Sequence, residues 1–445
     1  MYDAVVIGGG PGGYTCAIRA AQLGAKVCLI EKNGLGGTCT QRGCIPTKYL
    51  HSLGEIVRRT NSAKKSGINA TVQIDYSVMK SKMFATVSRL ALGIKKLLES
   101  NGVEVIQGEA SIQSANRINV DNGLSVETRN IVIATGSVPV CLPGYQFGKQ
   151  ILSTTSVLEL DQMPRSITII GGGYSGCEFA SILNALGCKV CLIEAQGQLL
   201  PLQISEIGEI IERFMKLDGI RIMTKSSVDK IIDTTVFVNQ QEIKSEKILI
   251  CTGRRPNVRT EELSRLGLNL DSRGIIVNDK MQTNIPSIYA VGDVTGMFEL
   301  AHMAAKQGEI AAENIVGITD SGLDYRMVPV CIFTYPEVAI VGDFSENDKT
   351  GEFPLVASAK ANCLGDTKGT IKVFEKDGKL VGTYIVASHA GEIIGEAALA
   401  IKMNLQAKDI YDTILPHPTL PESFQDAVRD IYNESIHLPS KRKAV

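Results

Sequence analysis

Apolar runs and spaced glycines alternate at the start of the chain. Residues 4–7 are all apolar, which predicts a buried strand, and Gly8, Gly10 and Gly13 follow directly. A helix-length stretch comes next, and a further apolar run ends at Glu31. This order predicts a strand, a tight turn, a helix and a second strand parallel to the first.

The same pattern returns further along the chain at a fixed offset. Residues 166–170 form the apolar run, Gly171, Gly173 and Gly176 form the triplet, and a second strand ends at Glu194. A lone triplet is a weak signal, but two complete copies predict two dinucleotide-binding units. In each unit we expect backbone N–H groups at the helix start to face a pyrophosphate and the acid to bind ribose hydroxyls.

Two dinucleotides in one chain are what a flavoenzyme that also uses a nicotinamide requires. The carboxylate of Glu194 suits a free ribose 2′-hydroxyl and repels a 2′-phosphate. The next residues, Ala195 and Gln196, offer no basic group to hold that phosphate. The sequence therefore predicts NAD rather than NADP.

Further elements surround the two units. Apolar residues at helical spacing over 83–98, including Leu90, predict an amphipathic packing helix. Apolar strands also run into small or acidic residues at 135–137, 252–253 and 292–293. Doubly wound sheets bind ligands at such carboxyl ends of strands.

The pattern changes near residue 328. Residues 372–386 alternate as a hairpin does and turn at Asp377 and Gly378. Residues 391–405 follow helical spacing. A third, α+β domain is therefore predicted to begin there.

Composition narrows the class of protein. The chain has 445 residues, of which 44% are hydrophobic and 21% charged, as expected of a globular protein with more than one domain. Its net charge of −1 gives no field that would attract nucleic acid or an anionic membrane. It shows neither a basic leader nor an apolar window long enough to cross a bilayer. The 11 cysteines mostly stand alone in apolar runs, so we expect a reducing compartment, the cytoplasm.

One segment, GGTCTQRGCIPTK at residues 36–48, carries two close cysteines, Cys39 and Cys44. A zinc site needs about four ligands, and the nearest histidine is His51. A structural disulfide would close only a tiny loop and is disfavoured in a reducing compartment. Two inert cysteines are the ordinary alternative to a redox pair.

The redox interpretation explains more of this segment. On a regular helix the two α-carbons would lie about 8–9 Å apart, whereas a disulfide needs about 7 Å or less. The turn must therefore be distorted, and glycines 36, 37 and 43 supply the freedom. A strained, accessible disulfide is labile. A helix starting near Cys44 would also lower the pKa of a thiol there.

These residues carry a resemblance that runs over essentially the whole chain. The chain resembles the class I pyridine nucleotide–disulfide oxidoreductases. The motifs concerned are the glycines of residues 8–13, GGTCTQRGCIPTK at 36–48, ATGS at 134–137, GGGYSGCE at 171–178, TGRRPN at 252–257, YAVGD at 289–293, LAH at 300–302 and HPTLPE at 417–422. CIPTK and the helix of residues 391–401 are most similar to the dihydrolipoamide dehydrogenase branch, and no cysteine follows Cys363.

The resemblance implies an α/β fold with two Rossmann-like dinucleotide-binding domains and a C-terminal α+β dimerisation domain. The implied boundaries are 1–142 for the first part of the FAD-binding domain, 143–265 for the NAD-binding domain, 266–327 for the second part of the FAD domain, and 328–445 for the dimerisation domain.

The implied reaction is the oxidation of protein-bound dihydrolipoyl groups with reduction of NAD⁺ to NADH through a redox-active disulfide. A glutathione reductase-like enzyme of the same family is the alternative. The implied cofactors are one non-covalent FAD per subunit and NAD⁺/NADH, with no metal. The implied partners are a second copy in a homodimer with a composite active site, and a lipoylated carrier of a 2-oxo acid dehydrogenase complex or the glycine cleavage system. Neither nucleic acid nor a membrane is expected as a partner.

The resemblance also assigns roles to residues. Cys39 exchanges with substrate, Cys44 faces the flavin, and His417 of the partner subunit, oriented by Glu422, is the base. The implied FAD-binding residues are Gly8, Gly10, Gly13, Glu31, Thr38, Lys48, Ala110, Thr135, Gly136, Ser137, Asp293, Leu300, Ala301 and His302. The implied NAD-binding residues are Gly171, Gly173, Gly176, Glu178, Glu194 and Gly253. Lys48 and Glu178 are expected to form an ion pair near the flavin.

Overall fold

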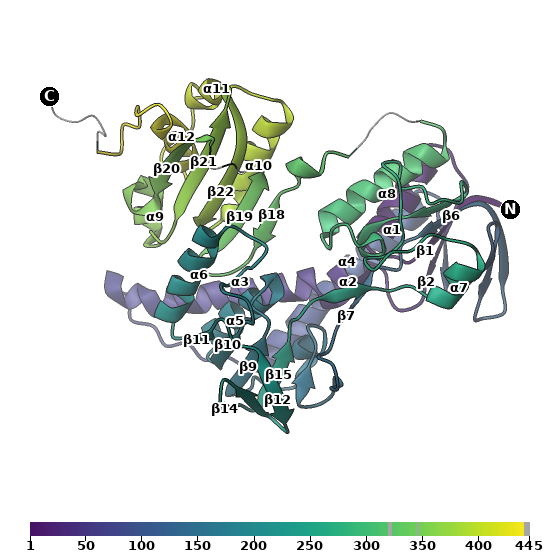
Figure 1. Cartoon of the computed structure of the whole chain (residues 1–445), viewed down its shortest axis with the longest axis horizontal. Helices are drawn as coiled ribbons and strands as arrows, with labels where there is room; N and C mark the ends of the chain where they lie inside the picture. The colour runs from purple at the N-terminus through teal and green to yellow at the C-terminus, as the bar shows by residue number, and fades with distance from the viewer. Residues whose placement is uncertain (319–322, 344, 346, 440–445) are drawn as a thin grey trace. The chain divides into compact units, whose positions relative to one another are not determined.

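A computed structural model describes residues 1–318, 323–343, 345 and 347–439 (Figure 1). It divides into two compact units. The first consists of Met1–Ile167 and Lys244–Leu323, and the second of Thr168–Ile243 and Asp324–Val445.

The first unit contains a seven-stranded sheet of order β3-β2-β1-β6-β5-β4, with β17 paired to β6. The strand β1 is parallel to both β2 and β6, which confirms the predicted strand–turn–helix–strand order. The bounds are β1 Tyr2–Ile7, β2 Val27–Glu31, β3 Glu104–Gln107, β4 Ala110–Ser114, β5 Arg117–Val120, β6 Ser125–Ile133 and β17 Ile288–Ala290.

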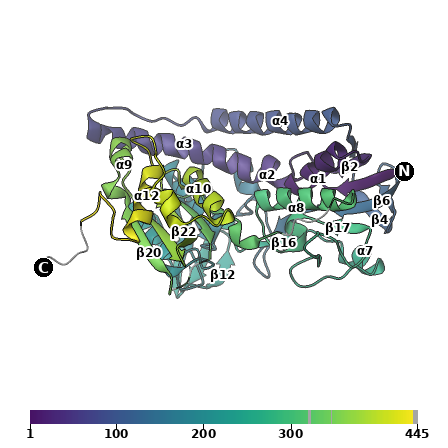
Figure 2. The ribbon, with the colours of Figure 1, turned by 90° about the horizontal axis from the view of Figure 1, so that it is seen from above.

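The helices α1 (Pro11–Gln22) and α8 (Ala301–Ile315) lie side by side in this unit (Figure 2). Their contact depends on glycine, because a Cβ on Gly308 would come within 2.3 Å of the carbonyl oxygen of Gly12. Buried side chains of α1, α8 and the parallel strands form one core cluster. This packing holds the first turn of α1 against α8 and the parallel strands.

The helix predicted over residues 83–98 belongs to the longer α4 (Tyr76–Ser100). Met83 and Val87 are buried as expected, but Leu90 is 40% exposed, so the apolar stripe is only partly covered within one chain. The unit also contains α2 Gly37–Arg42, α3 Cys44–Ser62 and α7 Thr260–Arg265. Its strand β7 Ser137–Pro139 forms a two-stranded antiparallel sheet with β16 Arg254–Pro256, and β8 Ile151–Leu152 is parallel to β15 Lys247–Ile250.

The second unit holds the second glycine-containing copy. Its strands β9, β10 and β11 are neighbours in that order, and β10 is parallel to β11. The bounds are β9 Ser166–Ile170, which begins at the unit boundary, α5 Tyr174–Ala185, β10 Lys189–Ile193, α6 Ser205–Leu217 and β11 Arg221–Met223, followed by a small sheet of β12 Val228–Ile232, β13 Thr235–Val238 and β14 Gln241–Lys244.

The C-terminal part of this unit is an antiparallel sheet of order β18-β19-β22-β21-β20 with helices packed on it. The predicted hairpin is confirmed, because β21 and β22 turn at Asp377 and Gly378, both with positive φ. The bounds are β18 Val330–Ile332, β19 Glu337–Gly342, β20 Lys349–Pro354, β21 Thr370–Lys376, β22 Lys379–Ala387, α9 Ala359–Leu364, α10 Ala390–Lys402, α11 Ala407–Tyr411 and α12 Pro421–Asp430. This is the α+β architecture expected from residue 328 onward.

Within the described ranges, none of the helices combines the length and the apolar character that crossing a bilayer requires.

Candidate active site

The first glycine turn is closed tightly. Gly8 has a φ of 108°, a region that side chains rarely adopt. A Cβ on Gly13 would lie 1.9 Å from the carbonyl oxygen of Gly8, so no larger residue fits there. Gly10 stands at the N-cap of α1 in an extended conformation. Gly8 and Gly13 thus form the tight turn that the sequence predicts.

The carboxylate of Glu31 fastens this turn. Its Oε2 accepts a hydrogen bond from the N–H of Gly9 at 2.6 Å, and its Oε1 accepts from Asn33 and Gly34 at 2.7 and 3.2 Å. A carboxylate offers about four acceptor sites, so capacity remains for a ribose hydroxyl. The sequence alone does not indicate that the acid also holds the backbone of its own turn.

The second copy repeats this geometry. Gly171 has a φ of 106°, and Gly173 is the N-cap of α5. The carboxylate of Glu194 accepts from the N–H of Gly172 through Oε2 and from that of Gln196 through Oε1, both at 2.6 Å. Glu194 stands one residue beyond the observed end of β10. Both copies therefore present the same turn and the same acid.

These two turns fit dinucleotides. Within the described residues, no side chain caps the N-terminus of α1 or α5, so their first N–H groups are left for a phosphate. Each helix start stands beside an acid that retains acceptor capacity. Each copy therefore offers N–H groups suited to a pyrophosphate and a carboxylate suited to a ribose.

The segment after Glu31 lies directly on the first turn. A Cβ on Gly37 would come within 2.6 Å of the α-carbon of Gly10. Helix α2 ends at Gly43, whose φ of −142° and ψ of −106° interrupt the helix, and α3 begins at Cys44. The predicted distortion between the two cysteines and the predicted helix start at Cys44 are both confirmed.

Both cysteines are thiols in the structure. A hydrogen bond to Cys44 and burial raise the pKa of Cys39 far above its ordinary value, while the positive charge of Lys48 opposes the rise and Asp293 adds to it. Cys39 therefore keeps its proton. The geometry brings Cys39, Cys44, Lys48 and Asp293 together in the first unit, whereas the disulfide itself stays a prediction.

A hydrogen-bonded chain holds Asp293. The hydroxyl of Ser137 donates to Asp293 Oδ2 at 2.5 Å. Arg254 donates through Nε to Ser137 Oγ at 2.7 Å and through Nη2 to the Ser137 carbonyl at 2.8 Å. The antiparallel pairing of β7 with β16 brings Arg254 there. Arg254 is not among the residues assigned from the sequence, although it lies in the TGRRPN motif.

The other residues assigned to FAD lie in the same unit. The N–H of Asn257 donates to the Gly136 carbonyl, and the hydroxyl of Thr135 donates to the Asn257 carbonyl. Leu300 caps α8, and Ala301 and His302 open it. Thr38 lies on α2 and Ala110 begins β4.

The residues assigned to NAD are divided between the units. Gly253 belongs to the first unit, and the others belong to the second. Glu178, buried on α5, accepts a hydrogen bond from the N–H of Phe333 at 2.9 Å. The sequence gives no sign of this contact. The ion pair of Lys48 with Glu178 would join the two units and stays a prediction.

The pair of His417 and Glu422 stands at the start of α12. The Nδ1–H of His417 donates to Glu422 Oε1 at 2.9 Å, and the N–H of Thr419 donates to Oε2 at 2.6 Å. Partial burial raises the pKa of Glu422, but these hydrogen bonds outweigh it, and the pKa is lowered. The imidazole is 69% exposed, with Nε2 left for a substrate. This is the geometry of a base oriented by a carboxylate.

A second pair of a histidine and a carboxylate, formed by Asp426 of α12 and His437 after the helix, was not assigned from the sequence. His437 Nδ1 lies 2.7 Å from Oδ2 of Asp426, which is buried. Asp426 lies one helical turn after Glu422. This pair holds the segment that follows α12.

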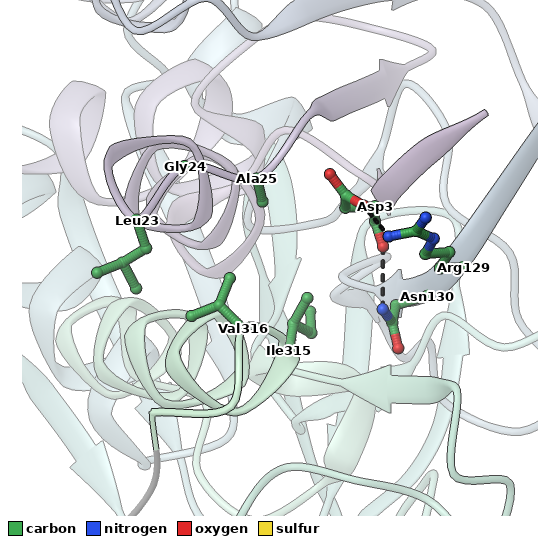
Figure 3. A pocket seen from close by; sticks show the side chains of 8 residues that line it. All are labelled: Asp3, Leu23, Gly24, Ala25, Arg129, Asn130, Ile315 and Val316. Carbon is green, nitrogen blue, oxygen red and sulfur yellow. Dashed lines mark hydrogen bonds and ion pairs between the residues drawn. The ribbon is translucent and has the colours of Figure 1, made fainter.

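A hollow elsewhere in the first unit is lined by the residues that follow α1, by Asp3 of β1, by Arg129 and Asn130 in the middle of β6, and by the end of α8 (Figure 3). Its polar groups bind one another, because Arg129 donates to Asp3 Oδ1 and Asn130 donates to the Asp3 carbonyl, both at 2.9 Å. It lies near the amino end of β1, away from the glycine turn that follows the other end of that strand. In the described part of the chain no three His, Cys, Asp or Glu side chains are grouped as metal ligands would be.

Comparisons with known proteins agree along the full length. Residues 2–308 match the family described as pyridine nucleotide-disulphide oxidoreductase, and residues 328–428 match its dimerisation domain. Dihydrolipoyl dehydrogenases of Chlamydia pneumoniae and Geobacillus stearothermophilus are 38% and 36% identical, over 99% of this chain and 99% and 98% of theirs.

Solved structures give the same picture. LpdA from Mycobacterium tuberculosis has a TM-score of 0.90 and 27% identity, covering 96% of this chain and 99% of that one. The HOCl-induced flavoprotein disulfide reductase RclA from Escherichia coli has a TM-score of 0.87 and 25% identity, with the same coverage.

Proposed function

Because the chain belongs to the pyridine nucleotide–disulphide oxidoreductases, we propose that it is a dihydrolipoyl dehydrogenase that uses FAD and NAD⁺. The observation that carries this proposal is the contact of Cys39 with Cys44 across the helix break, directly on the first glycine turn. Full-length similarity to proteins named dihydrolipoyl dehydrogenase supports the choice of substrate.

The first copy binds FAD and the second binds NAD⁺. The helix start behind Gly10 takes the FAD pyrophosphate, and Glu31 takes the adenosine ribose. The chain of Arg254, Ser137 and Asp293 offers a carboxylate to further hydroxyls of the cofactor. When bound, FAD supplies the two-electron transfer between the cysteine thiols and NAD⁺.

The protein's own groups perform the sulfur exchange, starting from a Cys39–Cys44 disulfide. His417 of the partner subunit takes a proton from one dihydrolipoyl thiol, and the resulting thiolate attacks Cys39, which breaks the disulfide and releases Cys44. The second lipoyl thiol then attacks the first lipoyl sulfur and closes the lipoyl ring, and the Cys39 sulfur leaves with the proton of that second thiol, so that Cys44 remains the thiolate and His417 keeps the first proton.

The composite site requires a homodimer, which the dimerisation domain supports. Leu399 of α10 and Met403, which follows the helix, are 59% and 60% exposed, and the space beside Gly395 is open. Glycine inside a helix costs about 1 kcal/mol relative to alanine, so its use there indicates that another chain approaches closely. This face of α10 forms part of the subunit contact.

The domain boundaries follow the same assignment: 1–142 and 266–327 bind FAD, 143–265 binds NAD⁺, and 328–445 forms the dimer contact. The two matched family segments, which end at 308 and begin at 328, support the last boundary. The partner is a lipoylated carrier protein of a 2-oxo acid dehydrogenase complex or the glycine cleavage system, and the enzyme works in the cytoplasm.

A direct assay tests the proposal. Purified, FAD-loaded protein should reduce NAD⁺ with dihydrolipoamide and should leave glutathione disulfide with NADPH essentially unchanged. Turnover of glutathione disulfide instead would favour the glutathione reductase-like alternative. Inactivity with both substrate pairs would refute the assignment.

A further inference from the structure

Lys225 follows β11 and stands beside the turn that carries Glu194. Its backbone N–H donates to the Gln196 carbonyl at 2.8 Å, and the N–H of Ser226 donates to the Glu194 carbonyl at 3.0 Å. Its Cε lies 3.7 Å from the position that a Cβ on Gly197 would take. The glycine leaves open the path along which the lysine side chain runs. The alkyl part of the lysine side chain therefore lies beside the acidic turn of the second copy.

The backbone at Lys225 is left-handed, with a φ of 52°. A lysine pays a conformational cost in this region that glycine avoids and asparagine reduces. The side chain is exposed and supports no buried packing that would offset the cost. A strained residue kept at a ligand turn points to a role for its side chain.

The lysine near the acid of the first copy has different contacts. Lys32, directly after Glu31, forms an ion pair with Glu109 at 2.9 Å, and Arg259 binds the same carboxylate at 2.5 Å. Lys32 thus has a carboxylate partner within the chain, which it shares with Arg259. Among the described residues, Lys225 forms no ion pair with a carboxylate. The lysine beside the acidic turn of the second copy thus differs from Lys32 in lacking a carboxylate partner among the described residues.

We propose that Lys225 is a second determinant of nicotinamide dinucleotide selectivity, acting against Glu194. The inference rests on the proposed function only in that the second copy binds a nicotinamide dinucleotide. Glu194 binds ribose hydroxyls and repels a 2′-phosphate. Lys225 attracts the dinucleotide as an anion, and it attracts the 2′-phosphorylated form more strongly because that form carries more negative charge at this end. The protein should therefore prefer NADH but retain measurable affinity for NADPH.

Direct binding of NADH and NADPH to the FAD-loaded protein tests this, without dihydrolipoamide present. Lys225→Asn keeps a residue that tolerates the left-handed backbone and removes the charge. We expect it to weaken NADPH about tenfold and NADH less than about threefold. The effect should shrink as salt is raised, because the charges are exposed. Lys225→Arg should restore NADPH affinity.

Lys189→Asn is the matched control, because it removes an exposed lysine at the opposite end of β10. It should change neither affinity. Equal weakening of NADH and NADPH by Lys225→Asn, or no change in either, would overturn the inference. If Lys225→Asn weakens NADPH binding more than NADH binding, but the unaltered protein fails to oxidise dihydrolipoamide, the role of Lys225 is upheld and the proposed substrate is rejected.

Discussion

The two glycine turns are nearly the same structure with different surroundings. Gly8 and Gly171 have φ values of 108° and 106°. The carboxylate of each acid accepts a hydrogen bond at 2.6 Å from the N–H of the next glycine, Gly9 or Gly172. In the first copy Gly37 presses on Gly10, and the cysteine pair follows at once. In the second copy no described atom lies within 4 Å of where a Cβ on Gly173 would stand.

This difference separates two tasks. The glycines and the acid form the same turn in both copies, and this turn suits a dinucleotide. The copies differ in the residues beside that turn, which are a pair of cysteines in the first copy and Lys225 in the second. Four changes break or sharpen that comparison.

The largest effect is expected from Cys44→Ser. It removes the sulfur that makes the first copy different, so dihydrolipoamide oxidation by NAD⁺ should become undetectable. Binding of NADH at the second copy should be unchanged, as measured by titration. Cys363→Ser, which alters an exposed thiol on α9, is the control and should keep full activity. Surviving activity in Cys44→Ser would remove the cysteine pair from the mechanism.

His417→Gln should lower dihydrolipoamide turnover about 10²–10⁴-fold, because a general base contributes that much. Retained FAD should be normal by absorbance. His437→Gln alters the other histidine paired with a carboxylate of α12 and should change turnover less than about twofold. If both variants lost activity equally, the loss would come from a disturbed α12 and not from the removal of a general base.

Gly37→Ala tests the contact between the first turn and the redox segment. The new Cβ meets the α-carbon of Gly10 at 2.6 Å in a left-handed backbone, so unfolding free energy should fall by about 2–3 kcal/mol. Gly173→Ala meets open space and should cost less than about 1 kcal/mol while weakening NADH binding. Chemical denaturation measures both, and equal losses would mean that the copies are packed alike.

The smallest effect concerns Glu422, whose pKa is lowered in the folded state. A lowered carboxyl pKa stabilises the fold above the ordinary glutamate value, and this stability is lost as the pH falls through the folded pKa. Glu422→Gln should therefore cost about 0.5–1 kcal/mol at pH 7, with the difference shrinking below about pH 4.5. A difference that is constant from pH 7 to pH 3 would show that the carboxylate charge has no part in it.

Local signals explain what could be predicted from the sequence. The strand before each triplet, the hairpin turn at Asp377 and Gly378, and the helix start at Cys44 depend on neighbours in the chain. Apolar runs, glycines and turn residues report these directly. The exposure of Leu90 was not predicted, because helical spacing marks an apolar stripe without saying which chain covers it.

Contacts that depend on distant pairing were not foreseen. Arg254 reaches Ser137 only through the register of β7 with β16. The N–H of Phe333 reaches Glu178 from a segment far along the chain. Lys225 reaches the acidic turn because β11 lies next to β10. The sequence has no basic residue directly after Glu194, but this says little about the charge at that turn in the folded protein.

The central claim is that electrons pass from dihydrolipoyl thiols through a disulfide between Cys39 and Cys44. Trypsin cuts after Arg42, so an oxidised protein should give peptides 33–42 and 43–48 joined by a disulfide in mass spectrometry. Anaerobic addition of one equivalent of dihydrolipoamide before trapping with an alkylating reagent should convert both into separate alkylated peptides, and subsequent NAD⁺ should restore the joined form. Two cysteines that are alkylated equally with and without dihydrolipoamide would contradict the account.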